Sequence, residues 1–588
     1  MLIVNFRYDI NALRAIAVLG VIFFHAGVGV FEGGFLGVDV FFVISGFLIT
    51  SHLIKDFNSG DFSIMKFYDR RIRRIMPVLI VTMLVTTVAS FFFMLPYDLK
   101  NFGQSLVSSA FGANNILLYL TSGYWSLAAE FKPLYHTWSL GVEEQYYFII
   151  PIILMLFFSK GFYGYVLSFL FLISWILSFN TQSLEFNFLS ITNRFWELCA
   201  GSLLAIGYPK IKYSSDKLSL LGFLLIIASY VSPYAISKSQ AIYSMLPVVG
   251  TMLIILFSKK DGVVSNFCQN KFINILGLSS YSIYLLHQPL LAFFRLSHEG
   301  ETTVSAELVV SLMAVPLGFL MWKYIENLFR DRVKVKNKVF YSLVSISLVC
   351  IVSFGLVLHK TYGLQNISAH QKYSYGNNPQ AYADKPYKLA KDHFESTGSK
   401  MLIVGNSFAR DFTNAITEVE LVKGYEVIYL YSYSENIEVS RKLLSDADVV
   451  FWVSAEGMAN KVVDSEELKV KTKEIKEELD NYAKDYLFIG TKNYGFNNNF
   501  VKQLHWEETV NYMVDINDSN LLANKDQSEI FLDKYVDLLE LTRDGNKTRI
   551  FTNEHRFLSF DTDHITRDGA VYLGSLLLKD ERLSRFKL

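Results

Sequence analysis

Residues 1–360 are dominated by long apolar runs that are separated by short polar connections. A helix crosses the hydrocarbon core of a bilayer, about 30 Å thick, with roughly 20 mostly apolar residues. With 51% hydrophobic and 19% charged residues, the chain has the balance of a membrane protein. We predict a multi-span α-helical membrane domain of about 11 transmembrane helices, with the interrupted run near 104–121 re-entrant or interfacial. The predicted spans lie near 10–30, 35–54, 77–96, 140–158, 162–179, 194–208, 217–235, 241–257, 273–295, 305–325 and 339–359.

The part of the chain after Lys360 has the composition of an ordinary soluble domain. Short apolar segments alternate there with charged helical stretches, and this alternation predicts an α/β domain with a parallel sheet. The predicted strands lie at 401–404, 427–431, 449–453 and 486–489. We therefore divide the chain into a membrane domain at 1–335, an additional transmembrane helix at 336–360, a linker or extension at 361–398 and an extracytoplasmic α/β domain at 399–588.

The basic residues predict the orientation of the chain, because they gather in cytoplasmic loops. With the N-terminus inside, an odd number of spans places everything after Lys360 outside. The first residues lack the order of a cleavable signal peptide, so we expect the first apolar run to remain as a span. The basic residues assigned to cytoplasmic loops are Arg70, Arg71, Arg73, Arg74, Lys210, Lys212, Lys217, Lys259, Lys260, Lys271 and those within 330–338.

All three cysteines, Cys199, Cys268 and Cys350, lie in or beside apolar segments. The soluble part therefore has no thiol to cross-link, and a disulfide scaffold is excluded there.

Arg14 and His25 are eleven residues apart on the first predicted span, which places them on one face at different depths. Ionisable side chains in a bilayer are costly and usually face a polar cavity. The pair therefore indicates a site. The alternative, that Arg14 snorkels to the inner surface and His25 bonds a neighbouring helix, stays open from these two residues alone.

Two further patterns carry charge in the membrane domain. The run from Arg70 to Arg74 presents guanidinium groups suited to a phosphate ligand, although any cytoplasmic loop can be basic. His136 precedes the adjacent Glu143 and Glu144, a combination that offers general-base chemistry or only an interfacial polar cap. Neighbouring residues on a helix diverge by about 100°, so at most one glutamate can face the cavity of His25.

These motifs resemble the acyltransferase-3 family of membrane acyltransferases over roughly residues 8–330. The similar blocks are Asp9-Ile-Asn-Ala-Leu-Arg14 with His25, Gly34-Phe-Leu-Gly-Val-Asp39-Val-Phe-Phe-Val-Ile-Ser45, Arg71 with Arg74, His136 to Gln145, and Tyr281-Ser-Ile-Tyr-Leu-Leu-His287-Gln-Pro.

The resemblance implies that acetyl-CoA or a related acyl-CoA is the donor at the cytoplasmic face, with Arg14, Arg71 and Arg74 in its binding site and no metal. It also implies that His25, helped by Glu143, is central to moving the acyl group. Structural and functional roles for His287 both stay open.

In the soluble part, Gly405-Asn406-Ser407 follows a predicted strand and opens a helix, where a tight turn can present a hydroxyl beside backbone N–H groups. A serine there is often only a helix cap. The distant Asp561-Thr-Asp-His564 adds a histidine and an aspartate, which completes a nucleophile, base and orienter.

This pairing resembles the SGNH hydrolase family, whose Gly-Asp-Ser block opens the domain and whose Asp-x-x-His block closes it. Asn406 stands at the usual aspartate, which removes no member of the triad. The resemblance implies Ser407, His564 and Asp561 as the catalytic residues, and Asp563 is one residue too close to be the orienter. For the oxyanion donors, Asn493 and Asn460 are candidates beside the Ser407 backbone N–H.

The fusion of the two units resembles bacterial O-antigen and surface-polysaccharide O-acetylases. We therefore expect a multi-pass protein of the bacterial inner membrane, with a cytoplasmic N-terminus and a periplasmic C-terminal domain. Its expected partners are acyl-CoA, a surface glycan such as lipopolysaccharide O-antigen and the lipid bilayer, without nucleic acid. A peptidoglycan O-acetyltransferase, a deacetylating esterase domain and a transporter-like membrane protein are the alternatives.

Overall fold

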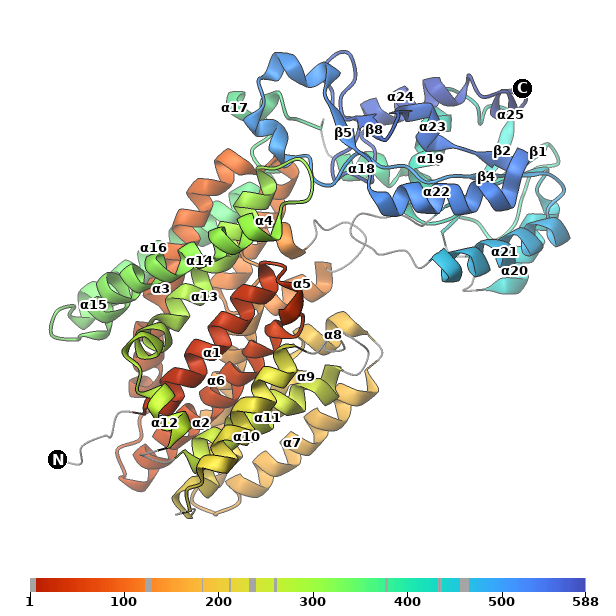
Figure 1. Ribbon diagram of the computed structural model, residues 1–588. Helices are drawn as coiled ribbons and strands as arrows, with labels where there is room; N and C mark the ends of the chain where they lie inside the picture. Colours follow the sequence, from red (N-terminus) through yellow and green to blue (C-terminus); the bar gives the residue numbers. More distant parts are fainter. Residues whose placement is uncertain are drawn as a thin grey trace.

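The computed structural model describes residues 7–121, 129–181, 183–210, 213–231, 240–258, 262–375, 379–431, 433, 436–454 and 465–586. A helical part runs to Lys360, and an α/β part begins at Ser399 (Figure 1). Lys212, Lys259 and Lys260 of the predicted cytoplasmic loops lie outside the described residues, as does the end of the predicted span 217–235.

Each of the eleven predicted apolar runs coincides with a helix in the structure. The run near 104–121 is split into two short helices, α4 and α5. The helices of this part are α1 Tyr8–His25, α2 Gly37–Asn58, α3 Ile64–Phe93, α4 Pro96–Ala110, α5 Asn114–Thr121, α6 Thr137–Phe157, α7 Tyr163–Asn180, α8 Leu184–Leu189, α9 Ile191–Gly207, α10 Asp216–Tyr230, α11 Gln240–Phe257, α12 Val263–Cys268, α13 Lys271–Leu296, α14 Val304–Met321, α15 Asn327–Arg330 and α16 Asn337–Lys360.

Among the described residues, seven helical segments are long and apolar enough to cross a membrane, judged by length and composition. They are Tyr8–His25, Gly34–Asn58, Ile64–Phe93, Thr137–Phe157, Tyr163–Asn180, Val304–Arg330 and Asn337–Lys360. The predicted spans in α9, α10, α11 and α13 are not among the seven. In α9 and α10 the helix is short, with 17 and 15 residues, whereas α13 is long but buries polar side chains such as His287, Gln288 and Arg295.

Glycines let the central helices approach each other closely. A Cβ at Gly46 of α2 would stand 1.9 Å from the Leu198 carbonyl oxygen of α9. In return, a Cβ at Gly201 of α9 would stand 2.0 Å from the Val43 carbonyl oxygen of α2. Small residues at helix contacts are the usual way in which membrane helices gain packing without a hydrophobic driving force.

The α/β part contains a five-stranded parallel sheet of order β2-β1-β3-β4-β6. Four of its strands are those predicted from the sequence; the two-residue β6 is additional. The strands are β1 Ser399–Val404, β2 Tyr425–Leu430, β3 Val449–Val453, β4 Tyr486–Ile489 and β6 Tyr535–Val536, and the helices include α19 Ser407–Glu418, α20 Ile437–Asp446, α21 Ser465–Tyr482, α22 Asp518–Phe531, α23 Leu538–Thr542, α24 Arg567–Leu577 and α25 Glu581–Ser584.

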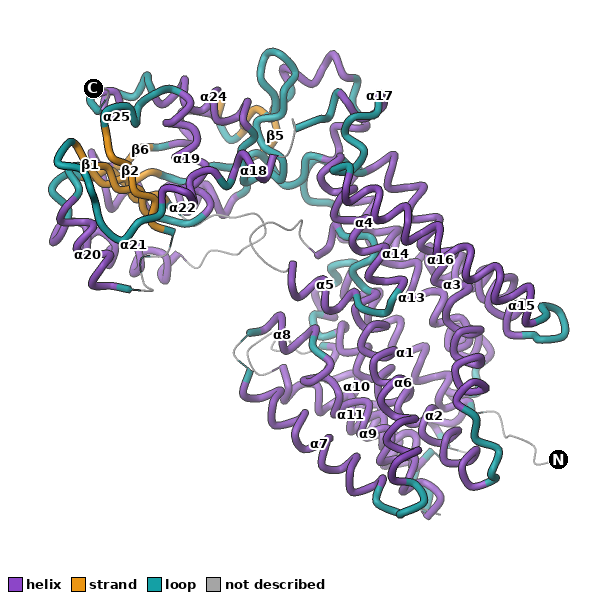
Figure 2. The backbone as a smooth tube through the Cα atoms, turned by 180° about the vertical axis from the view of Figure 1, so that it is seen from behind, coloured by secondary structure: helices purple, strands orange, loops and turns teal. Residues whose placement is uncertain are grey.

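Chain order reverses at β1, which lies between β2 and β3, so a crevice forms where the loops after β1 and β3 part. A second, antiparallel sheet joins β5 Met513–Asp515, β8 Lys547–Arg549 and β7 Arg543–Asp544. Before β1, the short helices α17 Ser368–Gln371 and α18 Pro379–Ala383 run over the α/β part (Figure 2). The Asn414 side chain of α19 donates to the Ala383 carbonyl oxygen (3.0 Å), so the described part of 361–398 is a packed extension.

The α/β part rests on one end of the helical part, and the start of α1 lies at the other end (Figure 1). Leu95 and Tyr97, which flank the start of α4, are buried in the hydrophobic cluster of the α/β part. Polar contacts across this boundary include Lys502 Nζ to Met94 O (2.9 Å), Asn499 Nδ2 to Asp98 Oδ2 (2.7 Å) and Asn497 Nδ2 to His298 O (2.8 Å). The two parts therefore form an apolar and hydrogen-bonded interface.

Candidate active sites

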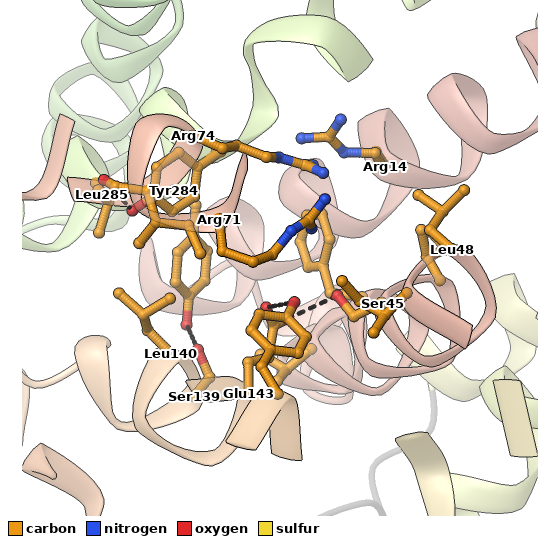
Figure 3. Close-up of a pocket in the computed structure, with 17 residues that line it drawn as sticks. Arg14, Ser45, Leu48, Arg71, Arg74, Ser139, Leu140, Glu143, Tyr284 and Leu285 are labelled. Carbon is orange, nitrogen blue, oxygen red and sulfur yellow. Dashed lines mark hydrogen bonds between the residues drawn. The ribbon is translucent and has the colours of Figure 1, made fainter. Parts of the chain in front are cut away.

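The first site is a cavity of about 80 Å³ between α1, α2, α3, α6 and α13. Arg14 of α1, Arg71 and Arg74 of α3 and Glu143 of α6 line it together. Figure 3 shows the three guanidinium groups pointing toward one another, with Glu143 across from them. The Glu143 carboxylate accepts hydrogen bonds from Ser45 Oγ (3.1 Å) and from the Tyr147 hydroxyl (2.7 Å).

The four arginines of the basic run differ in their ion pairs, and two of them form one. Arg70 forms an ion pair with Asp56 (2.7 Å) and Arg73 with Asp69 (3.2 Å). Arg73 is buried and also donates to the Phe329 carbonyl oxygen before α16 (2.9 Å).

Arg71 and Arg74 differ from these two because, like Arg14, they have no ion-pair partner within 4.0 Å in the part of the chain that the structure describes. The described lining of this confined space therefore holds three cationic groups and one carboxylate, Glu143. This imbalance favours an anionic ligand such as a phosphate.

The second site is a larger cavity of about 630 Å³, which His25 lines with His136, Lys132 and Arg295. The same cavity has aromatic walls that include Phe24, Tyr135, Trp138, Phe188 and Tyr284. The two cavities share Val38 and Tyr284, so they adjoin each other along the axis of α1.

The hydrogen bonds of His25 indicate its tautomer. Its Nδ1 lies 3.0 Å from the Val21 carbonyl oxygen, so this nitrogen carries the proton and Nε2 holds the lone pair. His287 Nδ1 likewise bonds the Tyr284 carbonyl oxygen (2.5 Å), which leaves His287 Nε2 as an acceptor 3.3 Å from His25 Nδ1. The backbone of His25 is held as well, because Arg295 Nη2 donates to its carbonyl oxygen (2.6 Å).

The position of Glu143 differs from the expected pairing with His25. Glu143 lies in the arginine cavity, whereas His136 lines the cavity of His25. The physical reason is depth, because seven residues along α6 correspond to about 10 Å of rise. Arg14 and His25, eleven residues apart on α1, likewise line different cavities at different depths, as their spacing predicted.

The third site, in the α/β part, brings together Ser407, His564 and Asp561. Ser407 Oγ lies 2.7 Å from His564 Nε2, and His564 Nδ1 lies 2.7 Å from Asp561 Oδ2. Asp561 Oδ1 accepts the backbone N–H of His564 (2.7 Å), so one carboxylate holds both the ring and the backbone of the histidine. This is the arrangement of an activated serine nucleophile with its base and orienter. Asp563 does not take the orienting position.

The turn before Ser407 depends on two residues. Gly405 has φ +139°, and a Cβ there would stand 2.8 Å from the Val453 carbonyl oxygen. Asn406 caps α19, since its side chain accepts the Phe408 N–H (3.0 Å). An aspartate would make the same bond, so the departure at Asn406 preserves the cap. Ser407 follows β1 directly and begins α19 at the crevice of the sheet.

Two buried residues that sequence reasoning missed support the loop of His564. Lys492 Nζ forms an ion pair with Asp411 (3.0 Å) and donates to the Asp563 carbonyl oxygen. Asp411 Oδ2 accepts the Ile565 N–H (3.0 Å). Burial alone would raise the pKa of the Asp411 carboxyl, but Lys492 and Arg410 lower it below its usual value.

A weak signal for this support was present in the sequence. Asp411 lies four residues after Ser407, on the same face of the helix.

The candidate oxyanion donors lie in different surroundings. The Asn493 side chain donates to the Gly495 carbonyl oxygen (3.3 Å) and accepts the backbone N–H of Gly495 (3.0 Å) and of Asn517 (3.2 Å). It therefore holds its own turn. Asn460 lies outside the described residues. The N-terminal end of α19 at Ser407 supplies the positive end of a helix dipole for a developing negative charge.

The sequence profile of the family described as "Acyltransferase domain" matches residues 7–323 of the 588. The chain belongs to the acyltransferase-3 family. The matched region is an acyltransferase domain and contains the first two cavities, with Arg14, Arg71, Arg74, Glu143 and His25. The apolar helices long enough to cross a bilayer indicate that this acyltransferase-3 chain is a membrane protein.

Two relatives of this acyltransferase-3 chain come from Staphylococcus aureus. The protein named "Putative O-acetyltransferase SACOL0978", from strain COL, is 28% identical over 364 residues, which cover 56% of this chain and 58% of the relative. "O-acetyltransferase OatA", from strain NCTC 8325 / PS 47, is 25% identical over 346 residues, which cover 55% of this chain and 57% of the relative. The chain thus spans less than two thirds of the relatives' length. No solved structure matches it.

Proposed function

We propose that this chain is a membrane O-acyltransferase that moves an acyl group, acetyl in the first place, from cytoplasmic acyl-CoA to a glycan outside the membrane. One observation carries the proposal: a phosphate-suited arginine cavity in an acyltransferase domain and a serine–histidine–aspartate triad occur in one chain, in parts that pack against each other. The names of the relatives support the acetyl group, since both include O-acetyltransferase.

The proposed topology has about 11 spans in the bacterial inner membrane, with the N-terminus in the cytoplasm and the α/β domain in the periplasm. The start of α1 lies at the end of the helical part away from the α/β part, which supports an odd number of spans (Figure 1). The arginine cavity then opens toward the cytoplasm and the His25 cavity toward the periplasm.

In the donor site, Arg14, Arg71 and Arg74 would bind phosphate groups of acyl-CoA, because guanidinium groups contact phosphate oxygens bidentately. The Glu143 carboxylate, held by Ser45 and Tyr147, would orient the arginines across the cavity. In the next cavity, the unprotonated Nε2 of His25 is the nitrogen that can act as a general base.

In the periplasmic domain, which we assign to the SGNH type, His564 would take the proton of Ser407 as Oγ forms an ester with the acyl carbon. The bond between the acyl carbon and the group that carries it would break in the same transfer, and His564 would pass the proton to that departing carrier group. A glycan hydroxyl would then attack the ester, lose its proton to His564 and form the new acyl–oxygen bond. Cleavage of the bond to Ser407 Oγ, with return of the proton from His564, restores the free serine.

The acceptor we propose is lipopolysaccharide O-antigen or a similar surface polysaccharide, and peptidoglycan is the second candidate. The relatives' names do not distinguish the two. Both acceptors would react at the same triad. They would differ in the residues beside Ser407 that bind the glycan.

The test is surface-glycan O-acetylation in cells that lack the protein and are complemented with wild type, His25→Ala or Ser407→Ala. Mass spectrometry of purified lipopolysaccharide and peptidoglycan shows which glycan loses acetyl groups. The exposed His52→Ala and Ser575→Ala variants, at matched protein level, are the controls. We expect one glycan to lose its acetyl signal in the null strain and in both site variants. Full acetylation of that glycan in both His25→Ala and Ser407→Ala would overturn the proposal.

A further inference from the structure

A third cavity, of about 300 Å³, lies in the membrane part between α4, α5 and the segment before α6. The described residues that line it include apolar side chains such as Met94, Phe102 and Leu118. It also has a set of polar or aromatic side chains that the acyl-transfer scheme above does not use. These are Tyr97, Asp98, Asn101, Gln104, Ser105 and Lys132.

Helix α4 presents four of these side chains from one face. Tyr97, Asn101, Gln104 and Ser105 follow the spacing of a single helical stripe. Gly103 lies on another face, where its Cβ would stand 2.7 Å from the Gly355 carbonyl oxygen of α16. Tight packing on α16 thus turns the polar stripe toward the cavity.

Two amides of that stripe are available to a ligand. Among the described residues, the side chains of Asn101 and Gln104 make no hydrogen bond, and both are only partly exposed. Polar groups without partners are costly in a largely apolar setting, and they commonly mark a binding site.

One wall of the cavity lies near the triad, with aromatic rings between them. The rings of Tyr97 and Phe560 lie 5.2 Å apart between centroids, and Phe560 stacks on the His564 ring at 6.0 Å and 21°. On the same side, Asp98 Oδ2 accepts from Asn499 of the α/β domain (2.7 Å). Two ring contacts therefore connect the cavity wall to the base of the triad.

We propose that this cavity binds a sugar unit of the acceptor glycan and presents its hydroxyl to the triad. The proposal rests on the proposed function and names the acceptor site within it. An aromatic ring next to amide, carboxylate, hydroxyl and ammonium groups is a lining that can pack against a sugar ring and hydrogen-bond its hydroxyls.

The reaction it serves is the second half of the transfer. The oxygen of the bound sugar's hydroxyl forms a bond to the acyl carbon of the Ser407 ester as the bond to Ser407 Oγ breaks. The hydroxyl proton goes to His564 and then to Ser407 Oγ, so no further reactant is needed. A site for the sugar and a site for the acyl donor are thereby separated in space.

The cavity shares Leu118 and Lys132 with the His25 cavity, so a place on the donor path is the competing assignment. The two assignments differ in what they do to the acyl-enzyme. Loss of an acceptor site leaves Ser407 acylated, whereas loss of a donor path leaves Ser407 free.

The experiment uses the full chain in cells and measures two quantities, acetyl on the Ser407 peptide and acetyl on the surface glycan. The variants are N101A/Q104A, which removes both amides, and S105W, which fills the cavity. N180A is the matched control, because it removes an exposed amide at the end of α7 that does not line this cavity. Immunoblots of membranes fix the amount of protein.

We expect glycan O-acetylation to fall about tenfold or more in N101A/Q104A and in S105W, as for hydrogen bonds lost from a substrate site, with acetyl-Ser407 at or above the wild-type level. Glycan acetylation within about twofold of N180A overturns the proposal, because an effect of that size is what a residue outside the site produces. A parallel fall of acetyl-Ser407 also overturns it and places the cavity on the donor path. If the proposed function itself is wrong, the Ser407→Ala variant will keep the wild-type level of glycan O-acetylation, which distinguishes that failure from failure of the acceptor site.

Discussion

Replacing Lys492 by methionine tests whether the buried support of the triad loop matters for transfer. Lys492 and Asp411 are 2% and 0% exposed and lie 3.0 Å apart. Methionine keeps most of the length and the apolar stem but removes the charge. Asp411 would keep its contact with Arg410 (3.1 Å), while the Asp563 carbonyl oxygen would lose its donor.

The expected cost follows from burial. Removing one partner of a buried ion pair lowers the free energy of unfolding by about 3–5 kcal/mol. We expect a value near the lower end here, because Asp411 keeps its ion pair with Arg410. A loss of that size lowers the midpoint of thermal unfolding of a domain this large by about 10 °C. A shift of the His564 loop by 1 Å would reduce transfer by up to about a hundredfold.

Calorimetry of the detergent-solubilised full chain and glycan O-acetylation in cells measure the two effects. Lys484→Met is the matched control, because Lys484 pairs with Asp448 at the surface (3.2 Å, 55% and 49% exposed), where an ion pair contributes about 0–1 kcal/mol. The double variant K492M/D411N also removes the buried carboxylate that K492M leaves paired with Arg410 alone, and should recover part of the stability. Equal unfolding and equal transfer in K492M and K484M would refute the reasoning.

The remaining predictions concern each site in turn. Gly405→Ala forces a Cβ toward the Val453 carbonyl oxygen at positive φ, so we expect the acetyl-Ser407 signal to fall at least about tenfold, by mass spectrometry. Arg71→Ala should raise the KM for acyl-CoA about tenfold or more in inverted membrane vesicles, because a phosphate contact is lost; Arg70→Ala, whose partner is Asp56, should leave it nearly unchanged. His287→Ala should lower glycan O-acetylation about tenfold, and His287→Gln should keep more of it by retaining an acceptor.

Acid should destabilise the α/β domain through Asp411. The folded-state pKa of Asp411 is depressed by Lys492 and Arg410, so its contribution to stability is present above the unfolded pKa of about 3.9 and is lost as pH falls through the lower folded pKa. We therefore expect the K492M variant, in which the pKa depression is smaller, to lose less stability than wild type between about pH 4 and pH 2. Calorimetry over this range checks the difference, and identical slopes would contradict it.

Much of the architecture could be predicted from the sequence because it follows from local patterns. Apolar runs of bilayer length became helices, and the segments at 401–404, 427–431, 449–453 and 486–489 became strands of a parallel sheet. The triad was also predictable, because each of its residues lies in a short motif that follows a strand or precedes a helix.

What the sequence did not indicate depends on contacts between distant segments. Lys492 supports the His564 loop from a turn after β4, and no local pattern marks such a role. The placement of Glu143 in the arginine cavity rather than beside His25 follows from the relative depth of two helices. Likewise, the contact of Tyr97 with Phe560 exists only because the α/β part rests on α4.

The most direct test of the two-site relay is the fate of a labelled acetyl group in the absence of any glycan. The full chain is reconstituted in vesicles with its cytoplasmic face toward isotope-labelled acetyl-CoA, and the Ser407 peptide is analysed by mass spectrometry. The account predicts a labelled acetyl ester on Ser407 in wild type and none in His25→Ala. Wild type without label on Ser407, or equal label in His25→Ala, would contradict it.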